Sequence, residues 1–113
     1  MISLLSEEIR HEANQGGVRI GKPLFVEFLK HMDLCYDEQL TDMVFMSDET
    51  VGRVAVEFVV NGIYKSTDSD LPEANNQKYV LPAGAFLEVK NELITRVTTY
   101  YNLPLWMEMV SKP

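Results

Sequence analysis

The last third of the chain, residues 79–110, limits the fold more than any other stretch. It reads YVLPAGAFLEV, then the polar KNEL, then ITRVTTYYN, and it ends in LPLWMEMV. Two alternating apolar runs joined by a short polar turn are typical of a β-hairpin. Tyr100 and Tyr101 end the second run, where a curved sheet can turn one of them toward a cavity. We therefore expect a sheet built around a pocket, followed by an amphipathic tail that carries Trp106.

Length and charge bound the rest of the molecule. A chain of 113 residues, of which 46% are apolar, suffices for one packed domain over residues 1–113 and is too short for two. It holds 17 acidic residues against 10 basic ones, a net charge of −7. Because so acidic a surface repels phosphate backbones, we expect no nucleic-acid partner.

Cysteine content and hydropathy indicate the compartment. Cys35 is the only cysteine, which excludes an intrachain disulfide and fits a reducing environment. The first apolar run is too short for a signal peptide, and no stretch approaches the roughly 20 apolar residues of a membrane span. We therefore expect a soluble cytoplasmic protein with no membrane partner.

The remaining elements follow from periodicity and from glycine and proline positions. Gly21 and Pro23 open a helix with apolar residues at helical spacing, and two strands with a polar connection come after it. The expected elements are a last helical turn over residues 1–6, a strand over 9–14, a loop over 15–17, a helix over 22–36, strands over 39–46 and 53–60, and an acidic loop over 66–77. Strands that follow a helix in a run predict an α+β fold with an antiparallel sheet.

Three blocks of the sequence resemble a known family. They read IRHEANQGGVRIGKPLFVEFL, VGRVAVEFVVNGIYKSTDSDLPEANNQKYVLPAGAFLEV and KNELITRVTTYYN, and they cover nearly the whole chain after Ser6. Their order and spacing are similar to those of SnoaL-like members of the nuclear transport factor 2-like superfamily, which also contains the ketosteroid isomerases. The second block would be a strand, a small-residue turn at Asn61-Gly62, a proline-bearing loop and a long strand.

The resemblance implies a cone-shaped α+β barrel, also called cystatin-like, in which a strongly curved antiparallel sheet wraps around a helix. The cone would hold a small apolar ligand, and the exposed sheet face would form a homodimer. Family members begin with a further helix, most of which this chain is expected to lack. The implied activity is a cofactor-independent proton transfer on an apolar carbonyl compound, by a steroid Δ-isomerase-like isomerase or a polyketide cyclase-like enzyme.

One departure from the family pattern leaves an alternative open. Gly84 or a neighbouring alanine in LPAGAF occupies the place where ketosteroid isomerases keep an oxyanion-binding aspartate. The acid/base aspartate of SnoaL-type cyclases would fall in the same stretch and is missing too. The alternative function is a non-catalytic module of the same fold that binds a small molecule or forms a dimer.

Glu12 is the first candidate for the base. The resemblance puts it where the isomerases keep a proton-shuttling aspartate, and a register slipped by one residue would put Ala13 there. A carboxylate that faces an apolar cone is desolvated, which raises its pKa. Glu12 and Asn14 share one side of a strand and His11 takes the other. In the slipped register His11 would be the inward residue and the base instead.

Other candidates would bind rather than move protons. Tyr64 lies where some SnoaL-like cyclases place a pocket histidine, so its phenol would donate to a ligand carbonyl. Aromatic residues of the predicted helix, strands and tail are expected to line the pocket. They are Phe28, Phe58, Phe86, Tyr100 and Trp106.

Metal-binding patterns are missing from the sequence. His11 and His31 lie far apart, and no HxH, HExxH or paired-cysteine spacing occurs. Cys35 comes late in an apolar helix, as a buried inert thiol would. We therefore expect no metal and no cofactor.

Overall fold

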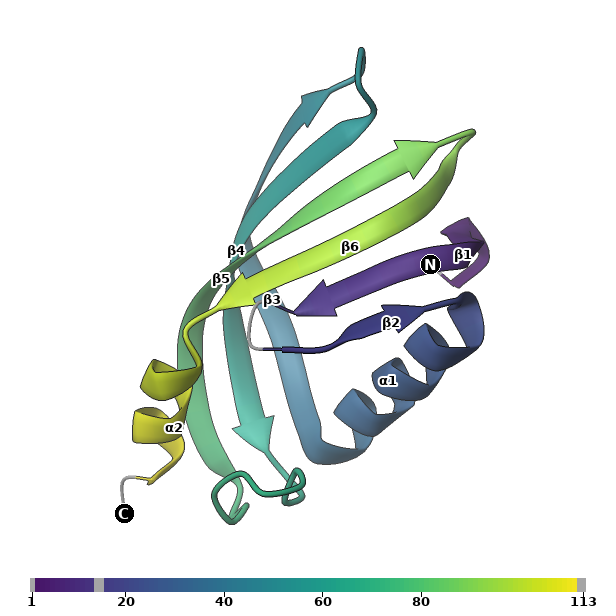
Figure 1. The fold of residues 1–113 in the computed structure, drawn as a ribbon. Coiled ribbons are helices and arrows are strands. Elements are labelled where there is room, and N and C mark those ends of the chain that lie inside the picture. The colour runs from purple at the N-terminus through teal and green to yellow at the C-terminus, as the bar shows by residue number, and fades with distance from the viewer. Residues whose placement is uncertain (1, 14–15, 112–113) are drawn as a thin grey trace.

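A computed structural model describes residues 2–13 and 16–111 of the chain (Figure 1). The elements alternate briefly between strand and helix and then run as four long strands. In chain order they are a 3-10 helix (Ile2–Leu4), β1 (Leu5–Ala13), β2 (Val18–Ile20), α1 (Lys22–Cys35), β3 (Tyr36–Asp48), β4 (Arg53–Tyr64), β5 (Gln77–Lys90), β6 (Leu93–Tyr101) and α2 (Leu103–Ser111). Among these residues no helix has the length and apolar character needed to cross a membrane.

One six-stranded sheet, in the order β2-β1-β6-β5-β4-β3, forms the body of the molecule. It is strongly curved (Figure 1), and every pair of neighbouring strands is antiparallel except the pair of β1 and β6, which is parallel. The prediction of an α+β fold with a curved sheet is confirmed, whereas the sheet is mixed rather than purely antiparallel. The first strand pairs with the last one, β6. Almost the whole chain connects the two, and so long a connection permits parallel pairing.

Strand register assigns the two faces of the sheet. His11, Val97, Leu87 and Val54 lie opposite one another in a row across β1, β6, β5 and β4, so all four share one face. Both helices pack against this face, which we call the inner face. The opposite one is the outer face.

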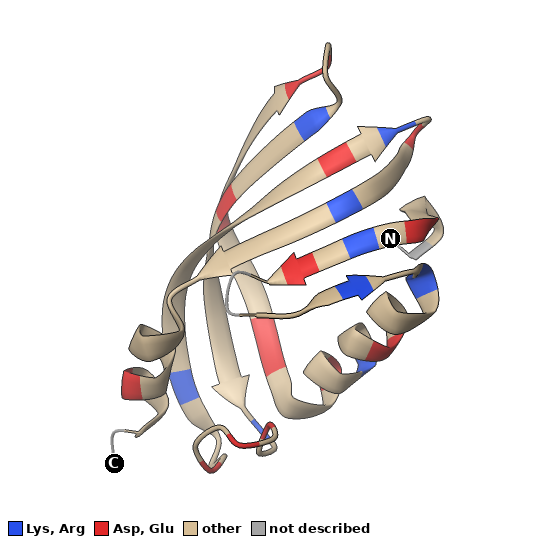
Figure 2. Cartoon of the chain, viewed as in Figure 1, with Lys and Arg blue, Asp and Glu red and all other residues tan. Residues whose placement is uncertain are grey.

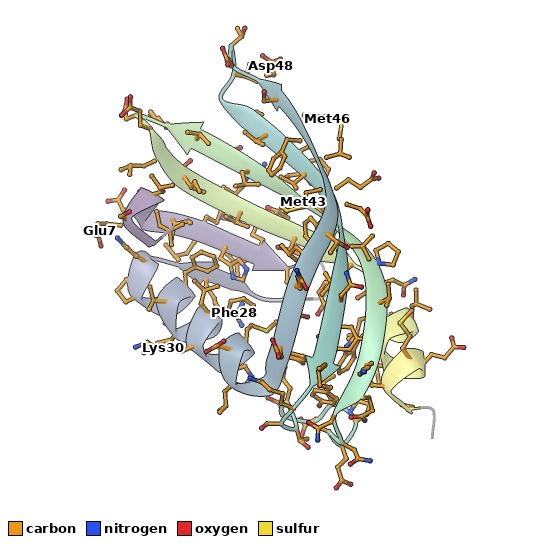
Figure 3. The ribbon with its side chains drawn as sticks, turned by 180° about the vertical axis from the view of Figure 1, so that it is seen from behind. Glu7, Phe28, Lys30, Met43, Met46 and Asp48 are labelled. Atoms are coloured by element: carbon orange, nitrogen blue, oxygen red, sulfur yellow. The ribbon has the colours of Figure 1, made fainter. Side chains whose placement is uncertain are left out.

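Two apolar clusters hold the helices on the inner face. The cluster under α1 contains Leu5, Ile9 and Phe25, and Phe28 packs against it. Figure 3 shows Phe28 on the sheet side of α1 and Lys30 on the other side. The larger cluster surrounds Trp106 of α2, which is only 4% exposed.

The predicted helix and closing hairpin are confirmed, with small shifts at their ends. Pro23 lies in the first turn of α1, and the helix ends when the N–H of Tyr36 donates to the carbonyl of Met32 and the chain continues directly as β3. The hairpin turns between β5 and β6 at Asn91 and Glu92, both of which have positive φ.

The expected turn at Asn61-Gly62 is wrong, because β4 continues unbroken to Tyr64. Gly62 has a packing role instead. A Cβ at this position would overlap the ring of Tyr79, which pairs with Gly62 from β5. The missing side chain lets this ring cross β4 and donate a hydrogen bond of 2.5 Å to Oε2 of Glu38 on β3.

Candidate functional site

His11 is the candidate base that the structure places on the inner face. Its side chain is buried, at 3% exposure, between β1 and α1. The imidazole centroid lies 4.6 Å from the ring of Phe25 and 4.5 Å from that of Phe28. These two phenylalanines are three residues apart and therefore share one face of the helix. His11 and Phe28, two predicted site residues, are thus in contact on the inner face.

Arg19 completes this group from β2, where it lies opposite His11. Its Nη1 is 3.5 Å from Nδ1 of His11, and its guanidinium carbon lies 4.4 Å from the ring centroid of Phe28. Arginine can only donate, so Nδ1 of His11 is the acceptor and the proton of the neutral ring sits on Nε2. Burial, and then the charge of Arg19, lower the pKa of His11 to about 4, so the imidazole is uncharged at neutral pH.

Small side chains lie next to this group on the inner face. Ala13 is on the same side of β1 as His11, and Thr99 of β6 and Ala85 of β5 follow it across the sheet. All three side chains are half-buried. Small, half-buried side chains therefore follow His11 along the inner face.

Glu12, the first candidate base from the sequence, points to the outer face. Its Oε1 lies 3.1 Å from Nε of Arg10 and accepts a 3.4 Å hydrogen bond from the hydroxyl of Thr98. The aromatic packing of His11 fixes β1 in the register that turns Glu12 outward, because successive strand residues alternate between faces. Asn14, its predicted partner, lies outside the described residues.

Tyr64 is fully buried, and its hydroxyl is already engaged by protein groups. It donates to the carbonyl of Pro72 at 2.6 Å and accepts from the N–H of Asp68 at 2.9 Å. The ring lies 5.0 Å from that of Trp106. Tyr64 therefore fastens the loop over residues 65–76 to the sheet.

The predicted pocket lining divides between the two faces. Phe28, Phe58 and Trp106 lie on the inner face or pack against it. Phe86 and Tyr100 do not, which corrects the prediction, because β5 and β6 turn them outward. Their rings meet edge to face at 5.4 Å on the outer face, where they are 45% and 47% exposed.

The C-terminal end of α1 holds a polar cluster that the sequence did not reveal. His31, Cys35 and Asp68 offer ligand atoms that all lie within 4.8 Å of one another. Nε2 of His31 is 2.7 Å from Oδ1 of Asp68 and 3.8 Å from Sγ of Cys35. The i, i+4 spacing of His31 and Cys35 on one helix was the available signal, and only the fold brings in Asp68.

Two open hollows occur elsewhere among the described residues. One, of about 920 Å³, lies between α2 and the loop, next to Glu73 and Met109, and the other, of about 300 Å³, lies near Asn61 and Val80. Neither reaches His11, and the enclosed apolar pocket stays a prediction.

Solved structures with this fold include close relatives. A protein from Silicibacter sp. TM1040 is 50% identical, with a TM-score of 0.95 over 99% of this chain and 82% of its own. One from Xanthomonas campestris pv. campestris is 48% identical, with a TM-score of 0.93 over 98% of this chain and 82% of its own. Both carry the provisional name polyketide cyclase.

More distant likeness extends to the fold alone. A protein from Jannaschia sp. CCS1, provisionally called a SnoaL-like polyketide cyclase, is 11% identical, with a TM-score of 0.78 over 98% of this chain and 76% of its own. No protein-family model and no curated protein matches the sequence. Given the identity and coverage of the two close relatives, the chain belongs to the same family as these proteins, and it shares its fold with the SnoaL-like proteins.

Proposed function

We propose that this protein is a cofactor-independent cyclase or isomerase that enolises a small apolar compound with two carbonyl groups separated by one carbon. The observation that carries the proposal is the pairing of a neutral, buried His11 with Arg19 on the inner face. The provisional name of the close relatives, polyketide cyclase, points to the same substrate class.

The two residues supply hydrogen-bond donation and positive charge. Nε2–H of His11 donates to a carbonyl oxygen of the substrate, and the guanidinium of Arg19 stabilises the negative charge that this oxygen gains. A neutral imidazole suits this role because its N–H donates a hydrogen bond to the carbonyl oxygen and keeps its own proton.

The proposed site needs no carboxylate base. A carbon between two carbonyl groups is already acidic, so a water molecule can take its proton once the oxygen is stabilised. In a cyclisation, the enolate carbon then forms a bond to a second carbonyl carbon, whose oxygen takes up a proton. This chemistry agrees with the small residues Ala83 and Ala85 on the inner face and with Glu12 on the outer one.

Paired variants separate this proposal from the sequence-predicted base. The probe is ketonisation of the benzoylacetone enol, followed by near-ultraviolet absorbance. His11→Phe keeps a ring between Phe25 and Phe28 and should lower kcat/KM by about 10²-fold, whereas Glu12→Gln should stay within about twofold of the parent. Loss of activity in Glu12→Gln alone would instead establish Glu12 as the base. An unchanged rate in both variants would favour the non-catalytic binding module.

We also propose that the outer face forms a homodimer through Phe86 and Tyr100. These rings are an exposed aromatic pair in the middle of the sheet, not at its edge. Around them the charges alternate in sign (Figure 2), and Glu88 bridges Arg53 at 3.6 Å and Arg96 at 3.2 Å. A second copy of the same face can therefore approach without net repulsion, despite the negative charge of the chain.

Light scattering tests the dimer. The parent should have twice the chain mass, and Phe86→Lys should halve it. Val80→Lys, at an exposed position near the start of β5, is the matched control and should leave the mass unchanged. A monomeric parent, or a dimeric Phe86→Lys variant, would contradict the proposal.

A further inference from the structure

We infer that His31, Cys35 and Asp68 form a zinc-binding site at the C-terminal end of α1. The three side chains come from one helix and from the loop that follows β4, and they converge from different directions. The site shares no residue with the His11 group, which consists of His11, Arg19, Phe25 and Phe28.

The donor set fits zinc. Thiolate, imidazole and one carboxylate form a mixed set that zinc takes with a water molecule in the fourth position, whereas magnesium and calcium prefer oxygen ligands alone. A tetrahedral zinc ion with ordinary bond lengths holds its ligand atoms about 3.3–3.6 Å apart. The pairs in the structure are separated by 2.7 Å and 3.8 Å, and the third by no more than 4.8 Å. Side-chain movements of about 1 Å therefore bring all three to bonding distance.

The carboxylate is held in place by groups outside the ligand set. The hydroxyl of Tyr36 donates to Oδ2 of Asp68 at 2.7 Å, which leaves Oδ1 toward His31 and Cys35. The backbone N–H of Asp68 donates to Tyr64 at 2.9 Å. Hydrogen bonds from groups that do not touch the metal orient carboxylate ligands in this way in metal sites.

The loop is also fastened at the metal-facing end of the helix. The carbonyl of Cys35 accepts hydrogen bonds from the N–H groups of Lys65 at 2.7 Å and Ser66 at 3.2 Å. The start of the loop is thus fixed to the same residue that supplies the thiol. Exposure agrees with a site that is open on one side, since Cys35 is buried at its base and the His31 side chain is 45% exposed.

The competing explanation is a plain His31–Asp68 hydrogen bond with Cys35 as a bystander. The zinc site requires the thiol of Cys35 to bind the metal as a thiolate, whereas the hydrogen bond alone does not involve it. Cobalt(II) reports on this directly, because a thiolate ligand gives an intense near-ultraviolet charge-transfer band. Untagged full-length protein with one equivalent of cobalt should show that band, and excess zinc should remove it. Absence of the band in the parent protein would overturn the inference without any variant.

Variants assign the remaining ligands. Zinc affinity, measured by competition with a chromophoric chelator, should correspond to one site and fall about tenfold or more in Cys35→Ser, His31→Gln and Asp68→Asn. Tyr36→Phe should weaken binding by up to about tenfold as a positioning variant. Asp70→Asn, an exposed acid of the same loop, is the control and should bind as the parent does. Circular dichroism checks that each variant is folded, and equal affinity in parent, Cys35→Ser and Asp68→Asn would overturn the site.

Discussion

Nη1 of Arg19 lies 3.5 Å from Nδ1 of His11, on the strand directly beside it. A permanent cation and a titratable ring are therefore held together against the aromatic face of α1. This arrangement makes protonation of His11 costly in the folded protein, and it has consequences for stability as well as for chemistry.

The first prediction concerns acid stability. The pKa of His11 falls from an ordinary 6.5 to about 4 on folding, mainly through burial, so the unfolded chain binds more protons between these values. His11 should therefore lower the free energy of unfolding as the pH drops from about 6.5 to 4, by on the order of 2–3 kcal/mol. Urea unfolding of the parent and of His11→Phe at several pH values measures this, and the difference between the two curves should change only within that window.

The second prediction concerns Gly62. A methyl group there collides with the ring of Tyr79, so Gly62→Ala should destabilise the fold by about 1–3 kcal/mol. In a Tyr79→Leu background the same substitution should cost much less, because the ring that it meets is gone. A double-mutant cycle in chemical denaturation gives the coupling. Equal costs in both backgrounds would show that the two residues are independent.

The third prediction concerns the loop anchor. Tyr64→Phe removes the partner of the Pro72 carbonyl and of the Asp68 N–H, so the protein should lose about 1–3 kcal/mol of stability. Hydrogen exchange should also speed up in the loop over residues 65–76. A loop that exchanges equally fast in the parent and in Tyr64→Phe would contradict the anchoring role.

Helical and strand periodicity predicted the α1 helix and the closing hairpin from local sequence alone. What they could not predict was pairing over long distances. The parallel pairing of β1 with β6 joins residues more than 80 positions apart, as at His11 and Val97, and it decides which side of β1 faces inward. Without that register, the sequence favours Glu12 as the base, and His11 would face inward only if the strand slipped by one residue.

The site residues show the same limit. Phe86 and Tyr100 look like pocket lining in the sequence because they alternate with other apolar residues, and only the curvature and the helix positions show which side is covered. Gly62 indicates a turn in the sequence because glycine is frequent in turns. In the structure its missing side chain leaves room for the Tyr79 ring. The His31, Cys35 and Asp68 cluster depends on a loop contact that no spacing rule describes.

The central claim is that His11, neutral and on the inner face, contacts the substrate while Glu12 does not. Nitrogen NMR of the His11 imidazole and carbon NMR of the Glu12 carboxyl, each titrated against pH and then against benzoylacetone, test it most directly. We predict a neutral ring with its proton on Nε2, an apparent pKa of about 4, and a shift of the Nε2 signal on ligand binding with the Glu12 carboxyl signal unmoved. An imidazole that titrates near 6.5 and ignores the ligand, together with a Glu12 signal that responds to it, would contradict the account.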